Sequence, residues 1–349
     1  MGNILDRKIK NIKKNFTRKA ALEFEAAIAG IVDNVVLKNF IKAIEERNIG
    51  KAIAALDIDE TTTAKLSEIL AATFNEVGIA VASGTIWRGV DYQKVVVRWN
   101  IANPRANRIL QEQSSRLVTR VSEGTKDVIA NALRGGFEQG KGPRSLALDV
   151  VGRIGANGRR VGGIVGLTGP QAEYVNNMRR RLETGNISEV KNMSKRDHRF
   201  DKTLNKHIMN GTRPSKTQIN KMVSRYSARL LKLRGDNIAR TETASSVLSA
   251  RQEAFEQWQQ KTGVPDKFVL KTWDHIGGGK KNRDGHQFTS GQKVVGLNTA
   301  FVVPSKKSGT VLMKRPLDTS LGAGASDVIN CTCDYRIRID HAGILKANG

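Results

Sequence analysis

Apolar residues recur at helical spacing through most of the first 260 positions of this chain. Residues 4–60 begin with an apolar stripe surrounded by basic side chains, a pattern typical of an amphipathic helix. Residues 105–154 and 171–260 show the same period, so we expect helices there as well. The first strand pattern is KVVVRWNI at residues 94–101, which is rich in β-branched residues and is followed by Pro104. The apolar stripe near the start consists of Ile4, Leu5, Ile9, Ile12 and Phe16.

The pattern changes after Gly263. Short strand-like runs follow one another there, namely DKFVLKTWDH, QKVVGLNTAFVVP and CDYRIRID, separated by segments rich in glycine, serine and lysine. The Gly-rich segment at residues 155–170 reads as a linker, because it lacks the residue order of a phosphate-binding loop. We therefore expect an α+β fold, with mostly helical N-terminal and middle regions and a small β-rich C-terminal module. The expected domains are 1–93, 94–170, 171–262 and 263–349.

The chain is strongly basic, and the charge is concentrated in one region. Its 349 residues contain 58 Lys and Arg against 33 Asp and Glu, a formal net charge of +25. Residues 179–240 alone hold 17 Lys and Arg against 5 Asp and Glu. Such a balance predicts a polyanionic partner, with nucleic acid first and an anionic membrane second. Because aromatic residues are sparse there, we expect sequence-independent contacts to the phosphates of double-stranded DNA. The candidate contacts are Arg179, Arg180, Arg181, Lys221, Arg225, Arg229 and Lys232.

Both cysteines of the chain lie in a single C-x-C, at Cys331 and Cys333. A disulfide between them is a poor explanation, because residues at i and i+2 of a strand seldom allow strain-free closure. Together with His286 they offer three zinc ligands, and Asp274, His275 or Asp334 could supply a fourth. The alternative is that the two thiols are small buried side chains and that His286 hydrogen-bonds a turn. Both interpretations stay open at this point.

Several segments in order resemble a known family. They are WNIANPRANRIL, GFEQGKGPRSLALDVV, GGIVGLTGPQAEYV, RGDNIARTETASSV and the C-terminal series TWDH, RDGH, SGQKV and INCTC. This series resembles the Mu F-like minor head, or head-morphogenesis, proteins of tailed bacteriophages, from about residue 94 to 339. Ser290 departs from the family pattern, in which an aspartate precedes Gly291, and residues 275–286 carry extra glycines and lysines. The matching positions are Arg240, Thr241, Glu242, Trp273, Asp274, Arg283, His286, Gly291, Phe301, Pro304, Pro316, Asp318, Asn330, Cys331 and Cys333.

The resemblance implies a structural virion protein without enzymatic activity. Such a protein is made in the host cytoplasm and is built into the head interior near the portal, in several copies. It would contact the portal protein, the capsid and packaged DNA, and would act in head assembly, DNA packaging or genome delivery. The family-motif residues outside the His–Cys–Cys group would then have structural roles.

Two other classes of function remain as alternatives. One is an enzyme delivered with the genome, such as a nuclease or an ADP-ribosyltransferase-like protein, using Arg240, Glu242 or His286. Arg240 and Glu242 point to different faces of a helix, however, so they cannot act on one atom together. The other is a membrane-active ejection protein that uses residues 1–25 as an amphipathic helix. No run approaches 18 apolar residues, so we expect no transmembrane span.

Overall fold

The computed structural model describes residues 2–58, 61–276 and 283–348. The chain is α+β, as expected, with long helices in its N-terminal and middle regions and small sheets mainly toward the C-terminus. It divides into two compact units instead of four consecutive domains. Unit 1 contains residues 1–20, 67–114 and 237–349, and unit 2 contains residues 21–66 and 115–236. Each boundary falls inside a helix, within α1 (Gly2–Asn34), α4 (Thr61–Gly84), α5 (Pro104–Val118) and α11 (Lys216–Thr262).

The helical core of unit 1 forms where α1, α4 and α11 bury their apolar faces. Ile9, Ile12 and Phe16 of α1 are buried in one cluster with Phe74 of α4 and Trp258 of α11. Ile4 was expected to share the stripe of α1, but its side chain is exposed. The stripe therefore begins at Leu5, which packs partly buried against the same core.

The strand expected at residues 94–101 is largely absent. Only β2 (Lys94–Val95) forms, paired antiparallel with β1 (Trp87–Arg88). The chain leaves the strand because the indole of Trp99 packs on α4 at Gly78, where a Cβ atom would lie 2.2 Å from the ring. The Trp99 Nε1 group donates a hydrogen bond to the Asn75 side-chain oxygen at 2.8 Å. Tertiary packing of one aromatic ring has overridden the local strand preference.

Length and composition would allow one described helix to cross a membrane, over Thr63–Gly84. Half of that window is buried. Phe74, Val77 and Val81 lie in the core of unit 1, as the apolar residues of a core helix do.

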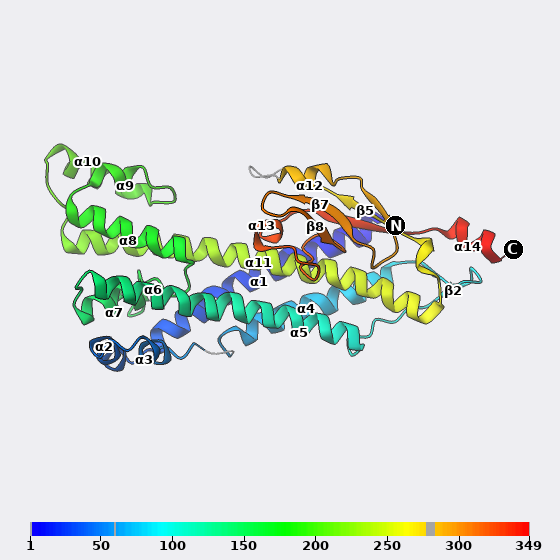
Figure 1. Cartoon of the computed structure of the whole chain (residues 1–349), viewed down its shortest axis with the longest axis horizontal. Coiled ribbons are helices and arrows are strands. Elements are labelled where there is room, and N and C mark those ends of the chain that lie inside the picture. Colours follow the sequence, from blue (N-terminus) through cyan, green and yellow to red (C-terminus); the bar gives the residue numbers. More distant parts are fainter. Residues whose placement is uncertain (1, 59–60, 277–282, 349) are drawn as a thin grey trace. The chain divides into compact units, whose positions relative to one another are not determined.

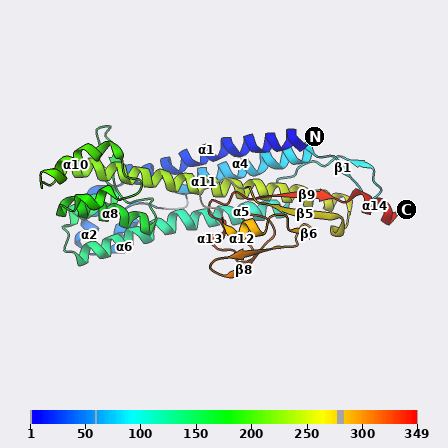
Figure 2. The same cartoon turned by 90° about the horizontal axis from the view of Figure 1, so that it is seen from above.

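The β-rich C-terminal module is confirmed, and it lies within unit 1. Strand β5 (Val269–Asp274) is the middle of an antiparallel sheet between β6 (Lys293–Val295) and β9 (Asp334–Ile339). Strands β7 (Phe301–Ser305) and β8 (Gly309–Met313) form a separate hairpin, of which β8 was not expected from the sequence. The strands lie beside the second half of α11 in both views (Figures 1 and 2). Short helices complete the module: η3 (Asp266–Phe268), α12 (Asp284–Phe288), α13 (Ala325–Val328) and α14 (His341–Asn348).

Unit 2 is mostly helical, and a π-helical turn lies between two of its helices. Between α5 and α6 (Gly124–Glu138) the chain forms the π-helix η1 (Thr119–Glu123). A π-turn leaves carbonyl groups outside the regular α-helical ladder. Here the carbonyl of Arg120 accepts a hydrogen bond from the buried Arg234 of α11, which also donates to Leu167. The remaining elements are α2 (Leu37–Glu45), α3 (Ile49–Ala54), α7 (Pro143–Val151), β3 (Arg153–Ile154), β4 (Arg160–Val161), α8 (Gly169–Thr184), α9 (Ile187–Lys191), η2 (His198–Phe200) and α10 (Asp201–Met209).

The Gly-rich segment at residues 155–170 is a packed connection and not the expected linker. It contains strand β4, and its apolar residues Ile164 and Leu167 are buried. A Cβ atom at Gly163 would lie 2.4 Å from the carbonyl oxygen of Val150, so only glycine allows this close approach. The glycines here serve backbone packing as well as turns.

Candidate metal centre and cationic surfaces

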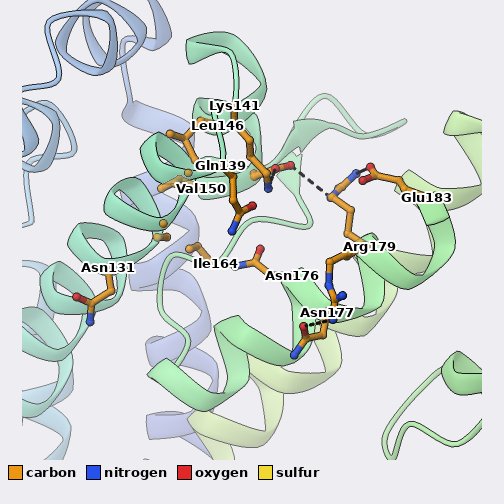
Figure 3. A pocket seen from close by; sticks show the side chains of 15 residues that line it. Asn131, Gln139, Lys141, Leu146, Val150, Ile164, Asn176, Asn177, Arg179 and Glu183 are labelled. Atoms are coloured by element: carbon orange, nitrogen blue, oxygen red, sulfur yellow. Dashed lines mark hydrogen bonds and ion pairs between the residues drawn. The ribbon is translucent and has the colours of Figure 1, made fainter. Parts of the chain in front are cut away.

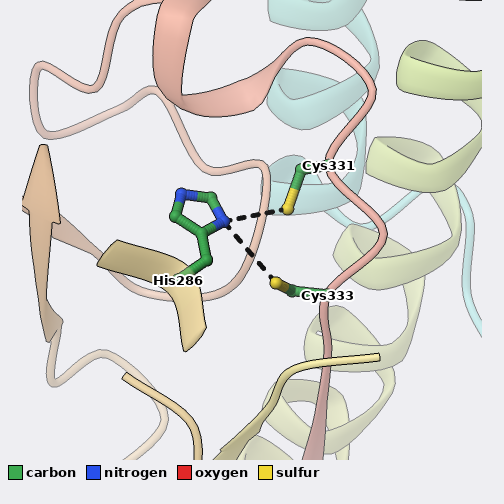
Figure 4. A group of neighbouring side chains, drawn as sticks. All are labelled: His286, Cys331 and Cys333. Carbon is green, nitrogen blue, oxygen red and sulfur yellow. Dashed lines mark hydrogen bonds between the residues drawn. The ribbon is translucent and has the colours of Figure 1, made fainter. Parts of the chain in front are cut away.

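His286, Cys331 and Cys333 lie together in the C-terminal module, as the sequence indicated (Figure 4). The Nδ1 atom of His286 is 3.2 Å from the Cys331 sulfur and 3.5 Å from the Cys333 sulfur. All three side chains are buried, and their potential ligand atoms lie within 4.8 Å of one another. This group, called the His–Cys–Cys group below, could hold a metal ion.

The two thiols of the group have different acidities. A hydrogen bond from the Cys333 thiol, supported by the His286 ring, lowers the pKa of Cys331 below its usual range. The same hydrogen bond, together with burial, raises the pKa of Cys333. The pair therefore favours one thiolate beside one thiol, and the thiolate is the form that binds metals.

Side chains from distant parts of the sequence fix the turn that presents the cysteines. Asn330 has a positive φ of 58°, and its backbone N–H donates to the Thr241 hydroxyl of α11 at 3.0 Å. Its side-chain amide donates to Asn237 at 2.9 Å. Arg283, at the start of α12, donates to the carbonyls of Ser326 and Ile329, which connects His286 with the segment before Cys331. The sequence did not reveal that Thr241 of the R-T-E motif supports the N-C-x-C turn.

Of the three residues expected as a possible fourth ligand, the two aspartates are engaged elsewhere. Asp274 makes a bidentate ion pair with Arg336, with both N–O distances at 2.7 Å. Asp334 pairs with Arg251 of α11 at 2.6 Å. The Nδ1 atom of His275, in contrast, lies 3.5 Å from the Cys333 sulfur.

Other family-motif residues lie where they shape local structure. The Trp273 indole packs edge-on against His286 and Phe301. The buried Asp318 accepts backbone hydrogen bonds from Lys314 and Ser320, and Pro304 lies in β7 against α12. On α11 the Arg240 side chain is exposed, whereas Glu242 is buried, so the two do not converge on one point.

Arg179 contradicts the expectation that it contacts nucleic acid. It is buried in unit 2 beside a polar cavity of about 300 Å³, where its Nε atom lies 3.3 Å from Asp149 (Figure 3). The guanidinium also donates to Asn220 at 3.0 Å. Asp149 is contacted by Lys141 and Arg153 as well, so it is the shared anion of three cations. Arg179 of the RRR motif therefore has a structural role. The motif itself could not indicate this, because the partner Asp149 lies 30 residues earlier in the chain.

Three further candidate contacts are engaged with carboxylates of unit 2. Arg181 pairs with Glu189 at 2.7 Å, Arg229 pairs with Asp197 at 3.2 Å, and Lys232 lies 3.6 Å from Glu25. The pKa of Asp197 is held at about 2, mainly by hydrogen bonds from Arg199. These three side chains are already partly neutralised by the fold.

The remaining candidates, Arg180, Lys221 and Arg225, are exposed. Within the part of the chain that the structure describes, none of them has a carboxylate oxygen within 4 Å. Arg180 donates a hydrogen bond to the Asn177 amide oxygen. Lys221 and Arg225 are four residues apart on α11, so they lie one above the other on its surface.

A second cationic surface lies on α1, which the sequence had marked only as a basic amphipathic helix. The apolar face of α1 is buried, and the opposite face carries six exposed cations without a described carboxylate within 4 Å. Lys13, on the edge of the buried face, is different, because burial lowers its pKa. The exposed set, called the α1 cationic face below, is Arg7, Lys8, Lys10, Lys14, Arg18 and Lys19.

No family model, no curated protein and no solved structure matches this chain. The resemblance to the Mu F-like proteins therefore stays a prediction from the sequence motifs.

Proposed function

We propose that this chain is a structural minor head protein of a tailed-phage virion that contacts packaged double-stranded DNA without reading its sequence. The observation that carries the proposal is a division among its basic residues. Some are neutralised by carboxylates within the fold, whereas Lys221 and Arg225 of α11 and the α1 cationic face have no such partner among the described residues. Exposed cations that lie close together repel each other, so a polyanion that neutralises them is the fitting partner.

In unit 2 the proposed contact surface is on α11. Lys221 and Arg225 follow each other at one helical turn, about 6 Å apart along the axis. They present two cations in a row, which suits successive phosphates of a backbone better than a single compact anion. Contacts of this kind position a protein on DNA without carrying sequence information.

In unit 1 the proposed contact surface is the α1 cationic face. Asn11 and Asn15 lie among its cations and are exposed, so they add neutral hydrogen-bond donors suited to phosphate oxygens. A helix that lies on a membrane must offer its apolar face to the lipid. In α1 that face, with Ile12 and Phe16, is already buried in the core of unit 1. The polar character of what remains exposed favours DNA over a membrane surface.

The partners beyond DNA rest on the resemblance alone. The Mu F-like proteins associate with the portal and the capsid in the head interior. We therefore propose that the C-terminal module docks there, in several copies per virion, and that the protein acts in head assembly, packaging or genome delivery.

We further propose that the metal held by the His–Cys–Cys group is zinc in a structural role. Thiolate sulfur and imidazole nitrogen are the ligands of structural zinc sites. The described part of the module is small, with a three-stranded sheet, a hairpin and short helices, and a bound ion stabilises small folds of this kind considerably. Zinc would connect α12 with the segment before β9, in addition to the Arg283 hydrogen bonds and the packing of Trp273 on His286.

The proposed DNA contact is tested by reversing charge at the exposed pair on α11. The double variant Lys221→Glu/Arg225→Glu should weaken binding to a duplex of random sequence by about tenfold or more, because two phosphate contacts become repulsive. Fluorescence anisotropy with labelled DNA at fixed salt measures this. Circular dichroism checks that the helical content is unchanged.

The matched control changes the net charge of the same unit by the same amount. Lys38 and Lys42 are exposed and four residues apart on α2. The variant Lys38→Glu/Lys42→Glu should bind DNA nearly as well as the unchanged protein. Equal losses in the two variants would show that only net charge matters, and would overturn the assignment of a contact surface to α11.

A further inference from the structure

One histidine beside the His–Cys–Cys group has no role in the arrangement described so far. His275 directly follows β5, whereas His286 lies in α12 and the cysteines precede β9. Its Nδ1 atom is 3.5 Å from the Cys333 sulfur, the same separation as between Cys333 and His286. Its Nε2 atom is buried and has no hydrogen-bond partner among the described residues. An imidazole placed against a thiol in this way gains little from hydrogen bonding alone.

The three sulfur–nitrogen separations fit the edges of a zinc tetrahedron. With zinc–sulfur bonds of about 2.3 Å and zinc–nitrogen bonds of about 2.0–2.1 Å, tetrahedral angles place sulfur and nitrogen roughly 3.6 Å apart. The observed distances are 3.2 Å for Cys331 with His286, and 3.5 Å for Cys333 with each histidine. His286, Cys331 and Cys333 already lie within 4.8 Å of one another, whereas His275 is near Cys333 alone and its ring must move toward the other two donors to bind the same ion.

The competing donors near the site are already satisfied. Asp274 and Asp334 each face an arginine at 2.6–2.7 Å, so recruiting either would leave Arg336 or Arg251 without its carboxylate. Arg251 has a side-chain exposure of 14%, which makes its release especially costly. His275 faces no such competition among the described residues.

We propose that His275 is the fourth ligand of this centre, which makes it a closed site of two sulfurs and two nitrogens. The inference rests on the zinc role proposed above. Catalytic zinc sites keep one position open for water or substrate, whereas structural sites are filled by four protein ligands. With His275 bound, the ion has no open position and joins the end of β5, α12 and the start of β9. The centre then stabilises the module and does not activate water for hydrolysis.

X-ray absorption at the zinc edge and cobalt substitution test this ligand set on the full-length protein. The protein is purified with reducing agent, stripped with chelator and reloaded with one equivalent of Zn²⁺ or Co²⁺. We expect one tightly bound ion, a shell of two sulfurs and two nitrogens, and the intense visible bands of tetrahedral Co²⁺ with two thiolates.

His275→Ala should remove one nitrogen from the shell and weaken zinc binding by about 100-fold or more, because even outer-shell changes cost 10–100-fold. His275→Cys should restore tight binding with three sulfurs and a stronger thiolate charge-transfer band, which a merely structural role would not produce. His341→Ala, a histidine of the same unit outside the site, should leave binding and spectrum unchanged.

The possible failures are distinguishable. A tight site whose shell and affinity are the same in His275→Ala would overturn the role of His275 while leaving structural zinc in place. Absence of stoichiometric zinc in the reloaded unchanged protein would overturn both. Neither result bears on the DNA-contact proposal, which depends on α1 and α11.

Discussion

The ammonium group of Lys271 lies in the middle of the C-terminal module, fully buried on β5. Its three protons are all used, because Nζ donates to the carbonyls of Leu297 and Thr299 at 2.7 Å and of Lys314 at 2.6 Å. Burial nevertheless lowers the pKa of Lys271 to about 7, and the nearby Arg315 adds to the effect. A single lysine on β5 thus connects two loops of the module, the one between β6 and β7 and the one after β8.

Replacing Lys271 should alter both stability and its dependence on pH. The pKa of Lys271 is lower in the folded than in the unfolded chain, so between about pH 7 and 10 the unfolded state binds more protons and this group makes stability rise with pH. Below pH 7 both states are protonated and the cost of burying the charge is fully present. Lys271→Met should remove this rise and, by leaving carbonyls unpaired, lower the free energy of unfolding by about 1–3 kcal/mol at pH 7.

Chemical denaturation at pH 7 and pH 9.5 measures both effects of Lys271→Met. Lys293→Met changes an exposed lysine on the neighbouring strand β6 and should change neither quantity appreciably. An identical pH dependence of stability in Lys271→Met and in the unchanged protein would refute the account of this residue.

At the scale of the element, α1 shows which structural properties of a helix its hydrophobic periodicity can predict. Its helical pattern predicted which side packs inward, and Ile9, Ile12 and Phe16 are buried in the core of unit 1. The pattern could not show that Ile4 falls outside that core, or that the opposite face stays cationic after all neighbours are in place. Those properties depend on how α4 and α11 pack against α1, which the spacing of apolar residues within α1 does not determine.

The packing role of α1 predicts a clear contrast between two of its apolar residues. Phe16→Ala should lower the free energy of unfolding by about 3–5 kcal/mol, because it opens a cavity in the core of unit 1. Ile4→Ala, on the exposed side of the same helix, should cost less than about 0.5 kcal/mol. Thermal or urea denaturation of the two variants checks this. Equal, small losses would mean that the apolar face of α1 is free for another surface, such as a membrane.

The failures at this scale have specific physical causes. The strand expected at residues 94–101 ends early because Trp99 packs at Gly78, a contact between segments 21 residues apart. The glycines of 155–170 suggested a linker because composition does not distinguish a flexible segment from a backbone that packs closely, as Gly163 does against Val150. In both places a tertiary contact overrides the local preference.

For the whole molecule, the α+β class followed from the sequence and the domain division did not. Each compact unit combines segments that are distant in sequence, and every boundary lies within a continuous helix, where composition gives no signal. The His–Cys–Cys group could be anticipated because its residues are scarce and chemically distinctive. The contacts of Arg179 could not, because a run of arginines gives no sign that one of them faces Asp149 from inside the fold.

The central claim concerns the exposed cations that have no carboxylate partner among the described residues, and the salt dependence of DNA binding tests it most directly. The logarithm of the binding constant for duplex DNA should fall linearly with the logarithm of salt concentration, with a slope of about −0.9 for each phosphate neutralised. In Lys221→Glu/Arg225→Glu the slope should become shallower by about 2. Binding that does not respond to salt, or no binding at about 50 mM salt, would contradict the claim that these cations neutralise DNA phosphates.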